Sequence, residues 1–213
     1  MEKRSFQITE SRLKEFCKKR LSIPEPVKLF MGLILSQDTD LEMIKQELTS
    51  HFGRIDLQSP INPFDHTDYY IKEMGHGLQR CFLSFEDPAS PDQLAEIKLL
   101  TNRLEIMKGE ITGDGICRKV NIDPGILSLS NVILATTKNR AHRIYLSNGI
   151  YAEVTLIYSK NKGWQPLDWT YPDYRISGTI KFFHSIREKY YLQIRDHHGT
   201  HGSRNLDKIT VQD

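Results

Sequence analysis

The sequence predicts an α+β fold whose first half is a ferredoxin-like βαββαβ sandwich, extended by a helix, a β-hairpin and a C-terminal helix. The first observation is that 38% of the 213 residues are hydrophobic, which is enough to fill a core. The second is the order strand, helix, strand, strand, helix, strand that the apolar spacing indicates for the first half. A four-stranded antiparallel sheet with both helices on one face uses this order. A larger mixed sheet that includes the later strands is the alternative.

Apolar runs and their boundaries predict the first elements. Residues 27–35 are nearly all apolar, which is typical of an interior strand covered on both faces. Asp38 or Thr39 begins a helix that runs through His51, because apolar residues then recur at helical spacing. A strand about residues 54–61 follows.

The next elements repeat this pattern. Residues 79–86 alternate between two faces, as a strand does. Ser90, followed by proline, opens a helix from Asp92 to Met107. A strand at 118–123 completes the predicted sandwich.

The second half is predicted to contain a helix, a hairpin and a final helix. Residues 126–136 are predicted as a buried helix, with a strand as the alternative. Asn148 and Gly149 between two β-rich runs predict a tight hairpin over 143–158, because both central residues of such a turn need positive φ. Residues 176–195 are predicted as the last helix.

Composition along the chain predicts one α+β domain over 26–195. Residues 1–25 are predicted as an appendage, because they hold a basic amphipathic helix that ends at two prolines. Residues 196–213 are rich in Gly, His and charge and are predicted as a disordered tail.

Charge and cysteine usage exclude several classes of protein. The chain has 29 Lys and Arg against 27 Asp and Glu, which argues against a dedicated nucleic-acid surface. No apolar run approaches the length of a membrane span. Cys17, Cys81 and Cys117 are far apart, so neither a disulfide framework nor a cysteine zinc site fits. We therefore expect a cytoplasmic protein without a membrane or nucleic-acid partner.

Motifs that bind phosphate or carry out hydrolysis are missing from the sequence. Neither GxxxxGK[ST] nor GxGxxG follows a predicted strand, and HExxH, GxSxG and CxxC do not occur. The sequence therefore predicts no GTP site.

Ionisable residues instead cluster next to predicted strands, where rigid scaffolds usually carry function. Asp65 and Asp68 flank His66, a pattern suited to a divalent cation or to proton transfer. Asn121 and Asp123 share one face of a strand end, because side chains alternate with period two. In both places the alternative is that the carboxylates accept hydrogen bonds from the amides of their own turns.

A third cluster precedes the predicted hairpin. Two guanidinium groups, an ammonium, an imidazole and two hydroxyls lie within eight residues: Thr136, Thr137, Lys138, Arg140, His142 and Arg143. Such a group can grip a phosphate or a carboxylate. The alternative is a solvated basic connector.

Two further candidates follow in the second half. Glu153 lies on the second hairpin strand, and it is either a buried carboxylate that needs a partner or part of a solvent face. Residues 168–175 form an aromatic loop that is either a lid over a ligand or a plug over the core. The candidate residues of this loop are Trp169, Tyr171, Asp173 and Arg175.

Six separated blocks of the chain resemble a known family. They are PFDHTDYYIKEMG, LQRCFLSFE, LAEIKLLTNRLE, RKVNIDPGIL, VILATTKNRAHRIYLSNGIYAEVTLIY and WTYPDYR. In this order they are similar to a bacterial family of unknown function, domain-of-unknown-function 4416, from about Val27 to Arg195. Members are often labelled GTP-binding proteins, but the missing phosphate loop gives that label no support. The resemblance implies a soluble bacterial protein and supplies no reaction.

The resulting hypothesis is a site for a small phosphate- or carboxylate-bearing molecule, with a divalent cation as an additional component. Three cations would hold the anion: Lys138, Arg140 and Arg143. Three carboxylates would bind the metal or move protons: Asp65, Asp123 and Glu153. The titrating group would be His66 or His142. The remaining candidates are assigned to ligand binding: Asp68, Asn121, Thr137, Trp169, Tyr171, Asp173 and Arg175. The alternative is a non-enzymatic interaction or homodimerisation module.

Overall fold

The computed structural model describes residues 24–113 and 115–199. Most of the predicted basic appendage and of the predicted tail therefore lies outside the described residues. Within the described part, no helix is long and apolar enough to cross a membrane.

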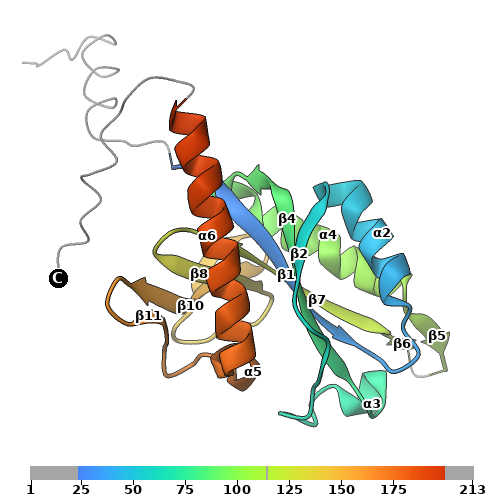
Figure 1. Cartoon of the computed structure of the whole chain (residues 1–213). Helices are drawn as coiled ribbons and strands as arrows, with labels where there is room; N and C mark the ends of the chain where they lie inside the picture. Colours follow the sequence, from blue (N-terminus) through green and yellow to red (C-terminus); the bar gives the residue numbers. More distant parts are fainter. Residues whose placement is uncertain (1–23, 114, 200–213) are drawn as a thin grey trace, which may run out of the picture.

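The centre of the fold is one antiparallel sheet with the strand order β11-β10-β8-β7-β1-β4-β2 (Figure 1). Two short strands are attached to it: β3 pairs with β4, and β9 pairs with β10. The sheet strands are β1 (Val27–Leu35), β2 (Ile55–Gln58), β3 (Asn62–Pro63), β4 (Gln79–Ala89), β7 (Val120–Leu127), β8 (Asn131–Thr136), β9 (Ile144–Ser147), β10 (Ile150–Ser159) and β11 (Gly163–Pro166). A separate hairpin consists of β5 (Glu110–Thr112) and β6 (Gly115–Cys117).

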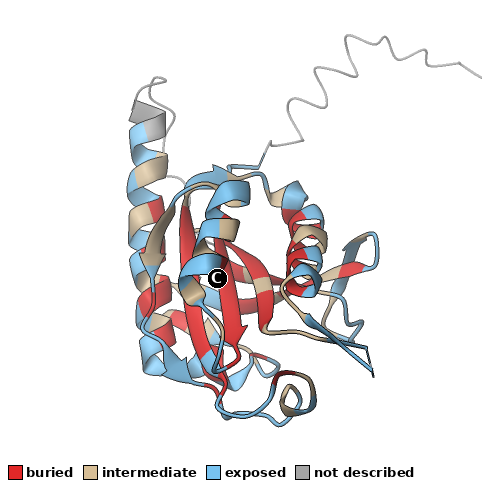
Figure 2. Cartoon of the chain, turned by 90° about the vertical axis from the view of Figure 1, so that its right-hand side faces the viewer, coloured by how far each residue is buried: buried red, intermediate tan, exposed pale blue. Residues whose placement is uncertain are grey.

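Helices cover both faces of this sheet. They are α2 (Leu41–Phe52), α3 (Ile71–Met74), α4 (Leu94–Met107), α5 (Pro172–Arg175) and α6 (Ser177–Gly199), and a 3₁₀ turn (Pro91–Gln93) precedes α4. Leu29, Met31 and Leu33 of β1 pack with α2 and α4 on one face. Phe30 packs on the other face, where the ring of Phe183 from α6 lies 5.0 Å away. Every residue of β1 is buried, and the outer faces of the helices carry the exposed residues (Figure 2).

The predicted α+β class is confirmed. The first-half strands lie in the order β7-β1-β4-β2, with α2 and α4 on one face, which is compatible with the ferredoxin-like arrangement. The sheet then continues through β8 and β10, so the larger sheet that includes the later strands is what forms.

The predicted helix at 126–136 is wrong. β7 continues to Leu127, a turn follows, and β8 occupies the rest of the segment. The Ser128 hydroxyl accepts the amides of Ser130 and Asn131 and so closes the turn. Because both faces of the sheet are covered, residues 126–127 and 132–135 are continuously apolar and lack the alternation that distinguishes a strand from a buried helix.

The predicted hairpin and final helix are confirmed. Asn148 (φ 52°) and Gly149 (φ 77°) both have positive φ, as the turn requires. β10 extends beyond the short β9 and pairs with β8 for most of its length. It is this second pairing that joins the hairpin to the main sheet.

A buried ion pair between β1 and β2 is hydrogen-bonded to α6. The ammonium of Lys28, in the middle of the apolar run, lies 2.5 Å from Asp56 and 3.1 Å from the Gln193 side-chain oxygen on α6. Burial lowers the pKa of Lys28, although the attraction of Asp56 opposes this shift. The polar residue in this strand is therefore buried with its partners.

The close approach of Phe30 to Gly125 gives a prediction about packing. A Cβ at residue 125 would lie 2.3 Å from Phe30 Cζ and 2.7 Å from the carbonyl oxygen of Ile133. Gly125→Ala should therefore lower the free energy of unfolding by about 1–3 kcal/mol in urea denaturation. Gly178→Ala is the control, because a Cβ at Gly178 meets nothing within 4 Å. It should leave stability unchanged or raise it by up to about 1 kcal/mol. Equal losses in both variants would contradict this packing account.

Candidate functional site

The main cavity of the described residues begins where two neighbouring strands separate. β7 pairs with β1 along its whole length, from Val120 to Leu127. It pairs with β8 only from Gly125 to Leu127. Residues 120–124 therefore have a strand on one side only, and a space opens between them and the end of β8.

Side chains of α4 take the place of the missing strand. Glu105 accepts the amide of Ile122 at 2.8 Å, and the ammonium of Lys98 donates to the Ile122 carbonyl at 2.8 Å. On the same edge, Pro124 has no amide hydrogen to pair. The backbone N–H and C=O of Ile122 are thus satisfied without β8.

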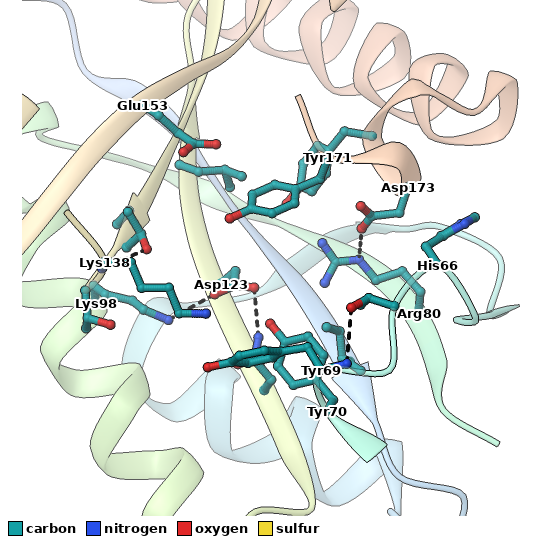
Figure 3. A pocket seen from close by; sticks show the side chains of 18 of the residues that line it. His66, Tyr69, Tyr70, Arg80, Lys98, Asp123, Lys138, Glu153, Tyr171 and Asp173 are labelled. Carbon is teal, nitrogen blue, oxygen red and sulfur yellow. Dashed lines mark hydrogen bonds and ion pairs between the residues drawn. The ribbon is translucent and has the colours of Figure 1, made fainter. Parts of the chain in front are cut away.

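The space between the strands is a cavity of about 580 Å³, a size typical of small-molecule sites. Three loops complete its walls: residues 64–70, 137–143 and 169–174. Figure 3 shows side chains from these loops, from the sheet and from α4 converging on one space.

Arg80 of β4 lies at the floor of this cavity and is 5% exposed. Its guanidinium crosses β1 at Gly32, where a Cβ would lie 2.7 Å from Arg80 Nη2. Its Nε lies 2.9 Å from Asp173 of α5, in an ion pair that is not aligned as a hydrogen bond. Burial by itself would lower the pKa of Arg80, but the combined attraction of Asp173 and of the other acidic groups around it, Asp123 among them, raises the pKa.

Aromatic rings surround this guanidinium. Its central carbon lies 4.5 Å from the ring centre of Phe82 and 5.3 Å from that of Tyr174. The hydroxyl of Tyr174 is buried, and burial raises its pKa well above the usual value. Arg80 is therefore held by one carboxylate and by ring faces, and part of its hydrogen-bonding capacity is unused.

Asp123 lies near the middle of the cavity wall (Figure 3). Its carboxylate is 3.1 Å from Lys98 and accepts a hydrogen bond of 2.8 Å from Asn121. Burial by itself would raise the pKa of Asp123, but the charges of Lys98 and Arg80 outweigh it and lower the pKa. The predicted shared face of Asn121 and Asp123 is confirmed. The predicted strand end at Asp123 is wrong, because β7 continues through Pro124.

Glu105 is the second carboxylate that Lys98 contacts, at 3.7 Å. It also pairs with Arg118, whose guanidinium is shared with Glu73 and Asn121. Burial raises the pKa of Glu105 above its usual value, although Lys98 opposes this shift. The charged side chains on the α4 side of the cavity are thus joined by ion pairs into one network.

Glu153 is a buried carboxylate, 2% exposed, and it pairs with the loop before the hairpin. Its Oε2 accepts from Arg143 Nε at 2.6 Å and lies 3.2 Å from His142 Nε2. Arg143 also donates to the Lys138 carbonyl and to the Tyr171 hydroxyl, each at 2.8 Å. Arg143 therefore fixes the shape of the loop from the inside.

Lys138 and Arg140 lie at the exposed rim. The ammonium of Lys138 is 3.9 Å from the ring centre of Tyr69, so two of the three loops meet there. Neither cation has a carboxylate partner among the described residues, in contrast to the cations deeper in the cavity.

Most of the residues that the sequence singled out line this one cavity. They are His66, Asn121, Asp123, Thr137, Lys138, Arg140, His142, Arg143, Glu153, Trp169, Tyr171 and Asp173. The aromatic loop contributes to the core, as the plug interpretation predicts, and also to the cavity wall. Tyr174 is packed in the core, whereas Trp169 is partly exposed and stacks on His142 at 5.0 Å.

Three candidates lie elsewhere. The Asp65 side chain is 85% exposed, and neither it nor Asp68 lines the cavity. Arg175 donates to the carbonyls of Leu167 and Thr170, so it holds its own loop together. Within the described chain, no group of three or more His, Cys, Asp or Glu residues is arranged to hold a metal ion. The three carboxylates suggested as metal ligands therefore do not form a metal-binding group. They are Asp65, Asp123 and Glu153.

Sequence reasoning missed the residues that complete the cavity. They are Arg80, Lys98, Asn102, Glu105, Arg118 and Tyr174. A signal was present at Arg80, which alternates with Phe82 and Ser84 in a strand that is buried on both faces. A charged residue in such a strand must have a partner. Lys98 and Glu105 gave no comparable signal, because charged residues are ordinary on a helix.

The role of Lys98 gives a prediction about pH. Lys98→Met removes the cation from Asp123 and Glu105, so stability should fall by about 3–5 kcal/mol at pH 7. Without Lys98, the pKa of both carboxyl groups in the folded variant would be higher than in the folded wild type, so the folded variant would bind more protons than the folded wild type as the pH falls. The loss should therefore shrink as the pH falls towards about 4.5 in urea denaturation.

The control is Lys45→Met, which breaks an exposed ion pair with Glu42. It should cost less than about 0.5 kcal/mol at either pH. A loss in Lys98→Met that stays the same at both pH values would contradict the ion-pair account.

Comparison with known proteins gives one match. A family model described as a domain of unknown function (DUF4416) matches residues 25–190. Searches of the curated proteins and of the solved structures each returned no significant match. The matched residues include β1, the α4 side chains at the opening and all three loops of the cavity. Because the match covers most of the chain, the protein belongs to the DUF4416 family.

Proposed function

We propose that the cavity binds a small anionic molecule through Lys138 and Arg140 at its rim. The observation that carries this proposal is that these two cations have no carboxylate partner within the described part of the chain, although they border a cavity of about 580 Å³. A phosphate or carboxylate group is the natural partner of such a pair, because Arg binds it as a fork and Lys as a point charge.

The charges of the whole lining support this proposal. Six Lys and Arg side chains line the cavity against four Asp and Glu side chains. Each of the four carboxylates already has a cation: Asp123 has Lys98, Glu105 has Arg118, Glu153 has Arg143 and Asp173 has Arg80. The excess positive charge therefore lies at the rim, where an anion entering from solvent meets it first.

The interactions of the carboxylates favour binding over acid–base chemistry. The two carboxylates suggested for catalysis that line the cavity, Asp123 and Glu153, are both engaged in ion pairs. The lowered pKa of Asp123 keeps it ionised near neutral pH, so it is not a ready proton donor. Their role in the proposal is to hold the cations and loops in place.

Removal of both rim cations tests the proposal. The double variant Lys138→Ala/Arg140→Ala should weaken binding of an organic phosphate at least about tenfold, since each charge-assisted hydrogen bond contributes about 1.5–3 kcal/mol. The probes are glucose 6-phosphate, ribose 5-phosphate and glycerol 3-phosphate, and the measurement is isothermal titration calorimetry. The melting temperature should stay close to that of the wild type, because both side chains are exposed.

Lys160→Ala is the matched control, because Lys160 is exposed and lies outside the cavity lining. It should bind the probes as the wild type does. The proposal is wrong if none of the organic phosphates binds the wild-type protein, or if the double variant binds them as tightly as Lys160→Ala does.

A further inference from the structure

We infer that the molecule bound here is a hydroxylated anion, with its acidic group at the rim and a neutral, hydroxyl-bearing body at the floor. This inference rests on the proposed function and adds the chemical class of the ligand. It comes from a contrast between the two ends of the cavity. The rim has unpaired charge, whereas the floor has paired charge and unused hydrogen-bonding atoms.

The charges at the floor cancel in pairs. Arg80 lies against Asp173, and Arg143 lies against Glu153. A guanidinium keeps its charge at every physiological pH, so both carboxylates remain compensated. A second acidic group or an ammonium on the ligand would therefore find no unbalanced charge there, and a neutral group fits better.

Apart from Arg80 Nε, which lies against Asp173, three polar atoms at the floor have no hydrogen-bond partner among the described residues. They are Nη1 of Arg80, Oε1 of Glu153 and the hydroxyl oxygen of Tyr174. Their residues are 5%, 2% and 1% exposed, and all three line the cavity. A buried polar atom without a partner destabilises a protein, so three of them at one cavity indicate a bound partner.

Hydroxyl groups match these three atoms. Arg80 Nη1 can only donate, Glu153 Oε1 can only accept, and the Tyr174 hydroxyl can do either. A ligand hydroxyl both donates and accepts, so a body with two or more hydroxyls can satisfy all three atoms. Carbonyl, ether or alkyl groups cannot donate to Glu153.

One observation indicates that Arg80 and Tyr174 act together, and a second places Glu153 across the cavity from Arg80. Both groups lie over Gly32, where a Cβ would be 2.7 Å from Arg80 Nη2 and 3.0 Å from the Tyr174 oxygen. Figure 3 shows Arg80 and Glu153 at different sides of the cavity, with Tyr171 between them. The floor therefore presents donors and an acceptor around one space, and an extended hydroxylated body can reach both sides.

The first experiment compares ligands on the wild-type protein. Cyclohexylmethyl phosphate keeps the six-membered ring and phosphate of glucose 6-phosphate and has no free alcohol groups. The tightest of glucose 6-phosphate, ribose 5-phosphate and glycerol 3-phosphate should bind at least about tenfold more tightly than this analogue, because a site that hydrogen-bonds a hydroxyl rejects a ligand without one. Equal or tighter binding of the analogue would overturn the inference and leave the proposed anion site standing.

The second experiment uses two Tyr→Phe variants. Tyr174→Phe removes a hydroxyl that has no hydrogen-bond partner in the described part of the chain, so the melting temperature should stay the same or rise, while the preference for the hydroxylated phosphate falls about threefold or more. Tyr190→Phe is the matched control, because the Tyr190 hydroxyl donates to the Pro26 carbonyl at 2.6 Å. It should lower the melting temperature and leave the preference unchanged.

The outcomes distinguish a failure of the hydroxylated-ligand inference from a failure of the proposed anion site. A Tyr174→Phe variant that keeps the full preference for the hydroxylated phosphate would contradict the role of the floor. If none of glucose 6-phosphate, ribose 5-phosphate, glycerol 3-phosphate and cyclohexylmethyl phosphate binds, the anion site itself is refuted. A large loss of stability in Tyr174→Phe would assign that hydroxyl a structural role and would overturn its assignment to the ligand.

Discussion

β7 pairs with β1 on one side, and on its other side the backbone N–H and C=O of Ile122 bind two side chains of α4. In an ordinary sheet the second side would belong to the next strand. Here Glu105 and Lys98 supply the acceptor and the donor, so β7 satisfies its hydrogen bonds without closing against β8. The opening between the strands, and with it the cavity, depends on these α4 side chains taking the place of a neighbouring strand.

The α4 side chains that take the place of the strand also bring charge into the fold. Lys98 and Glu105 are buried, and buried charges need partners. Asp123 and Arg118 supply them, and they extend the network from α4 to the opposite face of the sheet. That face also holds Arg80, which fits only because Gly32 has no side chain. The polar wall of the cavity is thus a consequence of how the strand edge is satisfied.

The fold could be predicted from the sequence wherever local patterns decide it. Asn148-Gly149 specified its hairpin by positive φ, and the apolar run at 27–35 indicated a strand covered on both faces. The segment 126–136 was predicted as a helix because an interior strand and a buried helix are both continuously apolar. Only pairing with distant strands decides between them.

The candidate site was predictable where ionisable residues stood in loops or interrupted an apolar strand, and less so elsewhere. Lys138 and Glu153 drew attention because a basic cluster precedes a hairpin and a carboxylate interrupts an apolar strand. Lys98 could not be found in this way, since its role depends on which strand edge α4 lies against. Asp65 was suggested by its neighbours in sequence, but its side chain lies in solvent.

The central claim is that the opening between β7 and β8 is a ligand site. An amide-detected NMR titration of the full-length protein with glucose 6-phosphate tests it directly. The account predicts that the largest shift changes fall on Ile122, on residues 137–143 and on residues 169–174. Saturable changes confined to another surface, such as the β5–β6 hairpin or the outer face of α6, would contradict it.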